Sequence, residues 1–313
     1  MFKYAAFLVS AVLLAGCGAT THSISSKPVA AAPKQVADAA CIKGNFSQDA
    51  SDSLTAMSFN IRYDNPSDGK NNWQYRAPKV ASLFDKHQVD LGGLQEVLHN
   101  QFEWLQANLP DYEFVGVGRD DGKTAGEYAP IFFRKSAFEL IKTDTVWLSP
   151  TPDVAGSKGW DAALPRITTF AILRHKQSGS SVLIGSAHYD HRGGYSRRAA
   201  GAIIHDYISQ QMAETDLPLV ILAGDFNDRP HTSAIKAIEK QNCMTDARKL
   251  AAERKGPNST WNGFRSIAPN ERIDYVFVNA GVPVFNHVID STKIDKRYPS
   301  DHLPVIASIG APQ

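Results

Sequence analysis

Short apolar runs alternate with longer amphipathic segments from residue 53 to the end of the chain. Runs of about four to eight apolar residues between turn-forming residues are typical of buried strands. We expect strands at residues 54–61, 89–97, 113–117, 130–134, 145–148, 167–173, 182–188, 219–225, 275–278 and 303–309. Longer segments place apolar residues on one face at helical spacing, as Val80, Leu83 and Phe84 do. We expect helices at residues 76–87, 99–109, 196–213 and 231–240.

The order of these elements predicts a layered α/β domain. Strands outnumber helices and often follow one another directly, which favours two packed sheets with helices outside over one doubly wound parallel sheet. A chain of 313 residues with 43% hydrophobic content can bury one large core. Turn-rich insertions at residues 63–76, 118–128 and 149–165 are expected at the surface, where loops often carry specificity.

The first residues have the pattern of an export signal. Lys3 precedes an apolar run at residues 5–15 that is too short to span a bilayer. Leu14-Ala15-Gly16-Cys17 resembles the bacterial lipoprotein box, in which the cysteine is lipidated, and an ordinary cleaved secretory peptide is the alternative. We therefore expect residues 1–17 to be a lipoprotein-type signal peptide. The protein would be exported, and either lipid-anchored through Cys17 to the outer membrane or cell surface, or periplasmic.

Residues 18–52 are rich in Ala, Ser, Thr, Lys and Pro, which predicts a flexible tether before a catalytic domain at residues 53–313. An oxidising compartment would permit Cys41 and Cys243 to form a disulfide. Two unpaired thiols are equally consistent with the sequence. Neither cysteine has metal-ligand spacing or lies beside a plausible catalytic base.

The charge of the chain bears on its substrates. The formal net charge is +1, and removal of residues 1–16 takes away Lys3 alone, which leaves a balance of zero. The basic surface typical of proteins that bind long nucleic acids is therefore missing. A local groove can still be positive on a neutral protein, so a nuclease is disfavoured rather than excluded.

Polar residues follow several of the predicted strands. Phosphate-ester hydrolysis needs a cation, a base that activates water, and donors that hold the phosphoryl oxygens. Residues of these kinds stand at strand ends in Ser58-Phe59-Asn60, Gln95-Glu96, His188-Tyr189-Asp190-His191, Gly224-Asp225-Phe226-Asn227, Ile273-Asp274 and Ser300-Asp301-His302. Each fragment alone is weak, because an Asp at a strand end is more often a turn or cap residue.

Jointly and in this order, the fragments resemble the endonuclease/exonuclease/phosphatase superfamily, which includes pancreatic deoxyribonuclease, inositol-phosphate phosphatases and bacterial sphingomyelinases. The likeness spans residues 54–309, and segments 126–133 and 156–161 depart from the nuclease branches, which points to an exported bacterial branch. The resemblance implies a four-layer α/β/β/α sandwich of two packed mixed sheets flanked by helices. It also implies a phosphoester substrate and a divalent cation, Mg²⁺ or Mn²⁺.

The resemblance further implies roles for individual residues at one edge of the two sheets. Glu96 would bind the metal, Asn60 would lie beside it, and Asp301 would complete the cluster. Asp225 would orient or deprotonate the attacking water, and Asn227 would hold the phosphate.

Histidine and arginine side chains would bind the phosphoryl oxygens. By the same likeness His302, oriented by Asp274, and His188 would stabilise the transition state. A carboxylate partner fixes the tautomer of a histidine and raises its basicity. Arg166 looks like the phosphate-facing arginine of the superfamily, and a surface salt bridge is an equally good reading.

Three further side chains in the predicted loops are candidates for contact with substrate. Arg119, Trp160 and His191 could read the substrate, or as exposed loop groups they could do nothing.

The sequence supports three hypotheses of function. The first is an exported, metal-dependent phosphodiesterase or phosphomonoesterase that acts, as a monomer, on a small or lipid-borne phosphoester. The second is an extracellular endonuclease or exonuclease that degrades DNA or RNA. The third is an inactive binding module, which would not require the complete set of acids, amides and imidazoles.

Overall fold

The computed structural model describes residues 44–241 and 244–313. Cys17, Cys41, Cys243 and most of the expected tether lie outside the described residues, so lipidation, export and the disulfide stay predictions. Within the described ranges, no helix is both long enough and apolar enough to cross a membrane.

The first of two sheets has seven strands in the order β10-β12-β13-β1-β2-β4-β3. It comprises β1 (Ser53–Asn60), β2 (Leu91–Gln95), β3 (Tyr112–Val115), β4 (Ile131–Arg134), β10 (Glu253–Lys255), β12 (Val284–Ile289) and β13 (Val305–Gly310). The sheet is mixed, because β1 runs parallel to β2 and antiparallel to β13.

The second sheet has six strands in the order β5-β6-β7-β8-β11-β9. It comprises β5 (Phe138–Trp147), β6 (Ile167–His175), β7 (Ser181–His188), β8 (Leu219–Asp225), β9 (Met244–Asp246) and β11 (Asp274–Asn279). This sheet is mixed too, since β8 runs parallel to β7 and antiparallel to β11.

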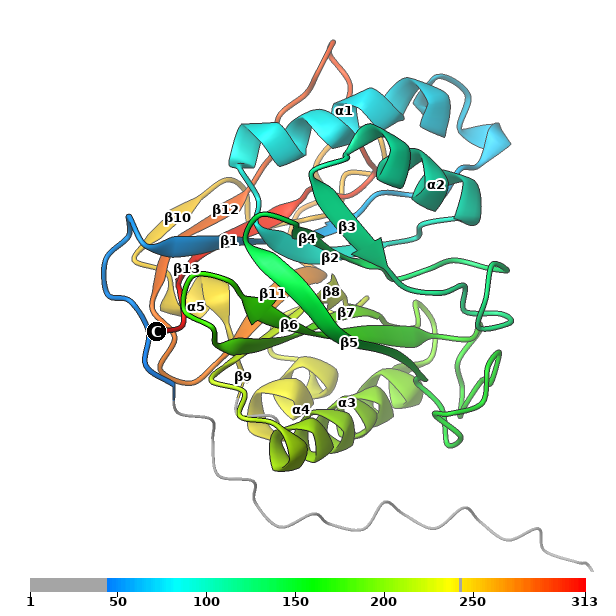
Figure 1. Cartoon of the computed structure of the whole chain (residues 1–313). Helices are drawn as coiled ribbons and strands as arrows, with labels where there is room; N and C mark the ends of the chain where they lie inside the picture. Colours follow the sequence, from blue (N-terminus) through cyan, green and yellow to red (C-terminus); the bar gives the residue numbers. More distant parts are fainter. Residues whose placement is uncertain (1–43, 242–243) are drawn as a thin grey trace, which may run out of the picture. The chain divides into compact units, whose positions relative to one another are not determined.

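Helices cover the outer faces of both sheets. They are α1 (Trp73–His87), α2 (His99–Asn108), α3 (Gly194–Glu214) and α4 (Ser233–Gln241). A 3₁₀ helix η1 (Pro66–Asn71) precedes α1, and the single-turn α5 (Ala247–Leu250) contacts strands of both sheets. Figure 1 shows α1 and α2 on one side of the paired sheets and α3 and α4 on the other. The expected four-layer α/β/β/α sandwich is therefore confirmed.

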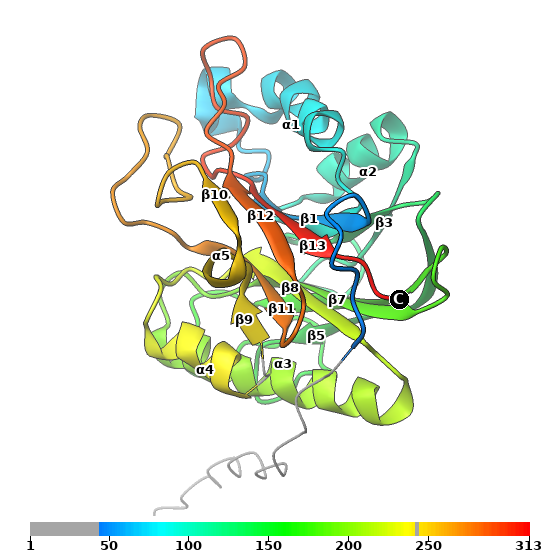
Figure 2. The ribbon, with the colours of Figure 1, turned by 90° about the vertical axis from the view of Figure 1, so that its left-hand side faces the viewer.

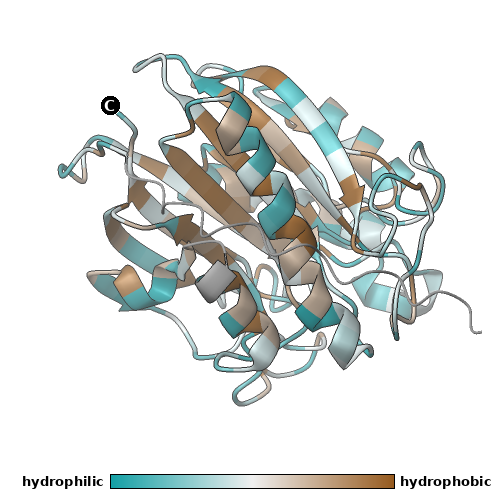
Figure 3. Ribbon diagram, turned by 90° about the horizontal axis from the view of Figure 1, so that it is seen from below, coloured by the Kyte–Doolittle hydropathy of each residue, from teal (hydrophilic) through white to brown (hydrophobic). Residues whose placement is uncertain are grey.

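Alternation along the strands produces three large cores, beside a small cluster of Ala129, Trp147 and Ile167. On β1, Ala56 faces the core between the sheets, while Met57 and Phe59 face α1 and α2, as the two-residue period of a strand requires. Phe277 of β11 packs outward with Ile204 of α3. The apolar strands stand out from the more polar helices in front of them in Figure 3. Each large side chain buried in these cores contributes roughly 1.5–3 kcal/mol.

The folded domain begins before Ser53, which corrects the expected tether boundary. Phe46 is 6% exposed and belongs to the core between the sheets. It forms a β-bridge with Pro312, and the Ser47 amide donates to the Ala311 carbonyl at 2.9 Å. Residues 44–52 therefore pack against the last residues of the chain.

All ten expected strands and all four expected helices are present, with shifted ends. Strand β5 begins at Phe138 rather than at residue 145, and three strands that the pattern did not predict, β9, β10 and β12, complete the sheets. The expected surface loop at residues 63–76 contains η1 and the start of α1, where Arg76 is buried.

Candidate active site

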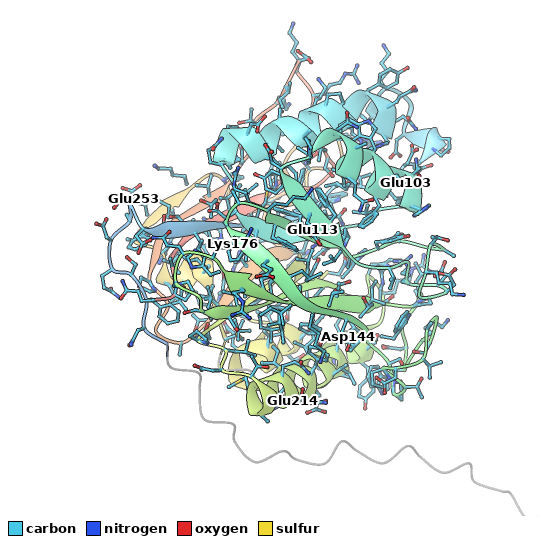
Figure 4. All side chains as sticks on the ribbon, viewed as in Figure 1. Glu103, Glu113, Asp144, Lys176, Glu214 and Glu253 are labelled. Atoms are coloured by element: carbon cyan, nitrogen blue, oxygen red, sulfur yellow. The ribbon has the colours of Figure 1, made fainter. Side chains whose placement is uncertain are left out.

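Strand pairing brings the predicted polar residues to one edge of the sandwich. In the first sheet Asn60 pairs with Gln95, so β1 and β2 end side by side. In the second sheet Asp225 lies between His188 and Asp274 in register. The exposed acids labelled in Figure 4, such as Glu214, contrast with Asp225 and Asp274, which are 1% and 0% exposed. A buried acid needs a partner or a ligand.

Asn60 links the two sheets at this edge. Its side chain is fully buried, and its Nδ2 donates to Glu96 Oε1 and to Asp225 Oδ2, both at 3.0 Å. Its Oδ1 accepts from the Arg62 amide at 3.0 Å. The amide therefore holds one acid from each sheet in a fixed position.

Arg62 stands between two of the predicted metal ligands, and the sequence reasoning missed it. Its Nη1 lies 3.7 Å from Glu96 Oε2, and its Nε lies 3.8 Å from Asp301 Oδ2 and 3.1 Å from Asp68 Oδ2. Burial lowers the pKa of Arg62, but the three carboxylates raise it by a larger amount, so the net shift of this pKa is upward. Burial raises the pKa of Asp301.

Several residues of this edge have left-handed backbone conformations. The φ angles are 60° at Arg62, 59° at Glu96 and 48° at Asn227. Such angles are uncommon outside glycine and cost on the order of 1–3 kcal/mol each where the conformation is sparsely populated. Arg62 and Glu96, which both have this conformation, contact each other through Nη1 and Oε2.

Asp274, His302 and Asp225 form a second buried group. His302 Nδ1 lies 2.9 Å from Asp274 Oδ2, and His302 Nε2 lies 3.9 Å from Asp225 Oδ2. Burial lowers the pKa of His302, but Asp274 and Asp225 raise it well above its usual value. Burial and the neighbouring Asp274 raise the pKa of Asp225 to about 7.

His188 flanks the same carboxylate from the other side. Its Nε2 lies 3.8 Å from Asp225 Oδ2 and 2.9 Å from Arg166 Nη1, and its Nδ1 lies 3.5 Å from Glu127 Oε2. Burial, followed by the charges of Arg166 and Arg119, lowers the pKa of His188 well below its usual value. A neutral and a cationic imidazole therefore flank Asp225.

Arg166 is a buried bridge, so the surface salt bridge considered for it is wrong. It is 5% exposed, with Nε 3.3 Å from Asp190 Oδ2 and Nη2 2.8 Å from His191 Nδ1. Asp190 also accepts from the Gly193 and Arg192 amides at 2.7 and 2.9 Å. Burial raises the pKa of Asp190, but these donors lower it overall. Asp190 was not predicted as a site residue from the sequence, although it is next to the candidate His191.

Arg119 is not the exposed loop group that the sequence suggested. It is 6% exposed and makes a two-point ion pair with Glu127, at 2.6 and 3.0 Å. Its carbonyl accepts from Trp147 Nε1 at 2.6 Å. Burial, followed by the charge of Glu96, raises the pKa of Glu127. Glu127 is a second residue that the sequence reasoning missed.

The remaining candidates differ in their connection to this cluster. Asn227 Nδ2 donates to the Tyr189 carbonyl at 3.0 Å, which ties together the loops after β7 and β8. The side chain of His191 is 42% exposed and reaches the cluster through Arg166. Trp160, 38% exposed, packs edge-to-face on Tyr195 and is not part of the hydrogen-bonded cluster among the described residues.

The side-chain oxygen and nitrogen atoms at this edge fit a hard divalent cation as its ligands. Ligand atoms of Glu96, His188 and Asp225 all lie within 4.8 Å of one another, and so do those of Asp225, Asp274 and His302. Asp274 Oδ1 is buried without a hydrogen-bond partner. Carboxylate oxygens suit Mg²⁺ and Mn²⁺. Of the predicted ligands, Glu96 belongs to the first group, and Asn60 donates to Glu96 and Asp225 within it. Asp301 is separated from Glu96 by the guanidinium of Arg62.

Comparison with known proteins agrees with this geometry. A model of the Endonuclease/Exonuclease/phosphatase family matches residues 57–302. An endonuclease/exonuclease/phosphatase from Bacteroides vulgatus is 40% identical, with a TM-score of 0.79 over 83% of this chain and 99% of that one. A mannosyl-6-phosphatase from Bacteroides thetaiotaomicron is 33% identical, with a TM-score of 0.77 over 82% of this chain and 99% of that one.

More distant structures share the fold. TDP2 from D. rerio, solved with a single-strand DNA product, is 18% identical, with a TM-score of 0.63 over 83% of this chain and 99% of that one. No curated protein sequence matches the chain. The family match over most of the chain, together with the two Bacteroides structures, establishes the assignment that the strand-end residues suggested. The chain belongs to the endonuclease/exonuclease/phosphatase family, whose members are hydrolases that act on phosphoesters.

Proposed function

We propose that this protein hydrolyses small phosphate monoesters with the aid of Mg²⁺ or Mn²⁺ at the edge where Asn60 joins the two sheets. The observation that carries the proposal is Asp225, a buried carboxylate with one neutral and one cationic imidazole at 3.8 and 3.9 Å, in a cluster that includes the acid Glu96. The likeness to a mannosyl-6-phosphatase supports a sugar phosphate as the class of substrate.

The acids and the amide at the sheet edge would hold the cation. Glu96 and Asp301 would be its carboxylate ligands, with Asn60 beside them as ligand or phosphate contact. A bound divalent cation neutralises charge on the phosphoryl oxygens and polarises the phosphorus centre. Release of Arg62 from Glu96 and Asp301 would leave its guanidinium free to face the phosphate.

Asp225 would orient the attacking water and take its proton. A general base works best when its pKa lies near the working pH. Burial raises the pKa of Asp225 to about 7, which suits this role at neutral pH. The side-chain amide of Asn60 and the backbone amide of Asn227 donate to its two oxygens and hold the carboxylate in place.

Cationic and neutral donors would bind the phosphoryl oxygens. His302 carries a proton on Nε2 when Asp274 holds Nδ1, so it can donate to the developing charge. Arg166 supplies a second fixed cation beside His188. Asn227 would hold the phosphate from the loop after β8.

We also propose that the protein is exported and anchored through a lipid on Cys17. The support is the apolar run at residues 5–15 followed by Leu14-Ala15-Gly16-Cys17. This segment lies outside the described residues.

A panel of substrates tests the proposed activity. The full chain should release phosphate from mannose 6-phosphate and p-nitrophenyl phosphate when Mg²⁺ or Mn²⁺ is added, and chelation should remove the activity. Bis-p-nitrophenyl phosphate, plasmid DNA and RNA complete the panel. Faster cleavage of DNA or RNA than of every monoester would replace the proposal with the nuclease hypothesis.

A further inference from the structure

A cavity is lined by α5 and by the loops that follow β8 and precede β11. Its volume of about 410 Å³ falls within the range of roughly 300–1,000 Å³ that is common for small-molecule sites. Cations dominate its lining, and none of the described residues that line it is acidic. The lining includes Arg229, Arg248, Lys249, Arg272, His231 and Asn258, and we call it the outer cationic cavity.

Two residues that line the outer cationic cavity are close in sequence to residues of the active-site edge. Arg229 follows Asn227 by two residues, and Arg272 precedes Asp274 by two residues. Two residues of extended chain span at most about 7 Å. Asp274 faces His302, whereas Arg272 contacts the ring of Tyr275 and pairs with Asp246 of β9.

The cavity therefore adjoins the ends of β8 and β11, which carry Asp225 and Asp274. Figure 2 shows α5 and β9, which carry or adjoin the lining residues, beside β11. Helix α4 begins at Ser233, two residues after His231. The positive end of a helix adds to the attraction of an anion.

Of the four Lys and Arg side chains that line the cavity, Arg248 is the one without a carboxylate partner among the described residues. Lys249 pairs with Glu239, and Arg229 pairs with Glu271, neither of which lines the cavity. Arg248 instead donates to Asn258 Oδ1 at 2.8 Å and contacts His287 Nδ1 at 3.3 Å.

Neither contact of Arg248 supplies a negative charge. Burial lowers the pKa of His287 to about 4, so its ring is neutral at pH 7. Burial and the neighbouring Arg272 lower the pKa of Arg248 itself. An anion in the cavity would compensate this guanidinium.

Arg272 adds an unsatisfied donor next to the cavity. Its side chain is 9% exposed, and its Nη1 is buried without a hydrogen-bond partner among the described residues. A buried donor left unsatisfied costs roughly 1–3 kcal/mol. Phosphate, sulfate and carboxylate groups match the planar fork of a guanidinium, because they accept two parallel hydrogen bonds.

We propose that the outer cationic cavity is a subsite for a second anionic group of the substrate, a phosphate, sulfate or carboxylate distinct from the scissile phosphate. The inference rests on the proposed hydrolysis of phosphate monoesters. It assigns the protein a preference for substrates that carry two anionic groups.

Kinetics on a matched pair of substrates test the subsite. Glucose 1,6-bisphosphate and glucose 6-phosphate differ only in the second phosphate. The wild type should show a kcat/KM about tenfold higher for the bisphosphate, which corresponds to about 1.4 kcal/mol. Arg248→Gln should lose this preference while its kcat/KM for glucose 6-phosphate stays unchanged. Arg229→Gln should weaken the preference, as a second variant on the exposed side of the cavity.

Arg174→Gln is the matched control, because Arg174 is an exposed arginine on β6 outside the cavity. It should keep the wild-type preference. Equal kcat/KM for the two esters in the wild type, or a preference that survives in both Arg248→Gln and Arg229→Gln, would overturn the proposal.

Direct binding separates this proposal from the proposed function. Sulfate is titrated calorimetrically into the full chain without metal, in the wild type, Arg248→Gln and Arg174→Gln. The wild type and Arg174→Gln should bind one more sulfate than Arg248→Gln. The same binding in all three overturns the cavity as an anion site, even if no ester is hydrolysed. A sulfate site that depends on Arg248 but has no effect on substrate preference would mean a free-anion site and would overturn the substrate subsite.

Discussion

His188 and His302 lie on either side of one carboxylate, and their surroundings shift their pKa values in opposite directions. Burial lowers the pKa of both imidazoles, and Arg166 lowers that of His188 further. At His302 the 2.9 Å contact with Asp274 outweighs burial and raises the pKa. Environments that separate the pKa values of neighbouring groups are typical of acid and base pairs in active sites.

The first prediction concerns His302 and Asp274 as one functional unit. His302→Ala should lower kcat by roughly 10²- to 10⁴-fold, the usual contribution of a positioned acid or base. Asp274→Asn should be similarly severe, because it removes the acceptor that fixes the tautomer of His302. The double variant should be little worse than either single variant.

Steady-state kinetics on any accepted monoester measure these effects. His99→Ala, at a half-exposed histidine of α2, is the control and should leave kcat unchanged. Losses that multiply in the double variant would show that His302 and Asp274 act independently.

His287 gives a prediction about stability and pH. Burial lowers its pKa in the folded protein to about 4, so between pH 4 and about 6.5 the unfolded chain binds the extra proton. Stability should therefore fall as the pH falls through this window, by on the order of 3 kcal/mol at about 1.36 kcal/mol for each pKa unit.

Urea unfolding at pH 7 and pH 5 measures this dependence. The wild type should lose stability at pH 5, and His287→Leu should lose clearly less. His99→Leu is the control and should show the wild-type pH dependence. An equal loss in His287→Leu would show that another group carries the effect.

The sequence located the polar residues at the strand ends but missed several partners. Asn60, Glu96 and Asp225 follow apolar strands, so their position could be predicted from local pattern alone. Glu127 reaches His188 from a loop 61 residues earlier in the chain, a contact that no local pattern encodes. Arg62 likewise reaches Asp301 only because β1 and β13 pair.

At the scale of elements, the strands that the pattern did not predict have physical reasons. In β12 the register shifts between Val284 and Asn286, which breaks the alternation that identifies a strand. Strand β9 has only three residues. The first half of β5 lies at the edge of its sheet and is mostly exposed, so its polar residues resembled a loop.

The Asp161 carboxylate fastens loop 149–165 to the start of helix α3. Asp161 accepts from the Ser196 amide at 2.7 Å and from the Tyr195 amide at 3.1 Å. Asp161→Ala should destabilise the protein, because it removes the acceptor of two amide hydrogen bonds in the first turn of α3. Asp153→Ala, at an exposed acid of the same loop, should change stability by less than about 0.5 kcal/mol.

Chemical denaturation of both variants measures the difference. A loss at Asp161 no larger than that at Asp153 would show that the loop is held by other contacts. Since Trp160 adjoins Asp161, an activity assay of the same variants also reports whether this loop affects catalysis.

At the scale of the whole molecule, the two mixed sheets place residues from distant parts of the chain at one edge. The balance of charges over the chain suits a small substrate, because long nucleic acids are bound mainly by clustered basic residues. The outer cationic cavity is a local exception to this balance.

Anchoring is a prediction about the whole chain. If Cys17 is lipidated, the full chain expressed in a bacterial host should sediment with membranes and dissolve in detergent. Cys17→Ser should release it or prevent its maturation. Recovery of the wild type entirely in the soluble fraction, with a mature N-terminus other than Cys17, would contradict lipidation.

Glu96 offers the most direct test of the central claim, which is metal-dependent hydrolysis at this sheet edge. Glu96→Gln should lower kcat on a phosphate monoester by roughly 10²-fold or more, since a metal contributes several kcal/mol to such a reaction. It should also lose Mn²⁺ binding measured by electron paramagnetic resonance, while Glu103→Gln on the exposed face of α2 keeps both properties. Full activity and full Mn²⁺ binding in Glu96→Gln would contradict the account.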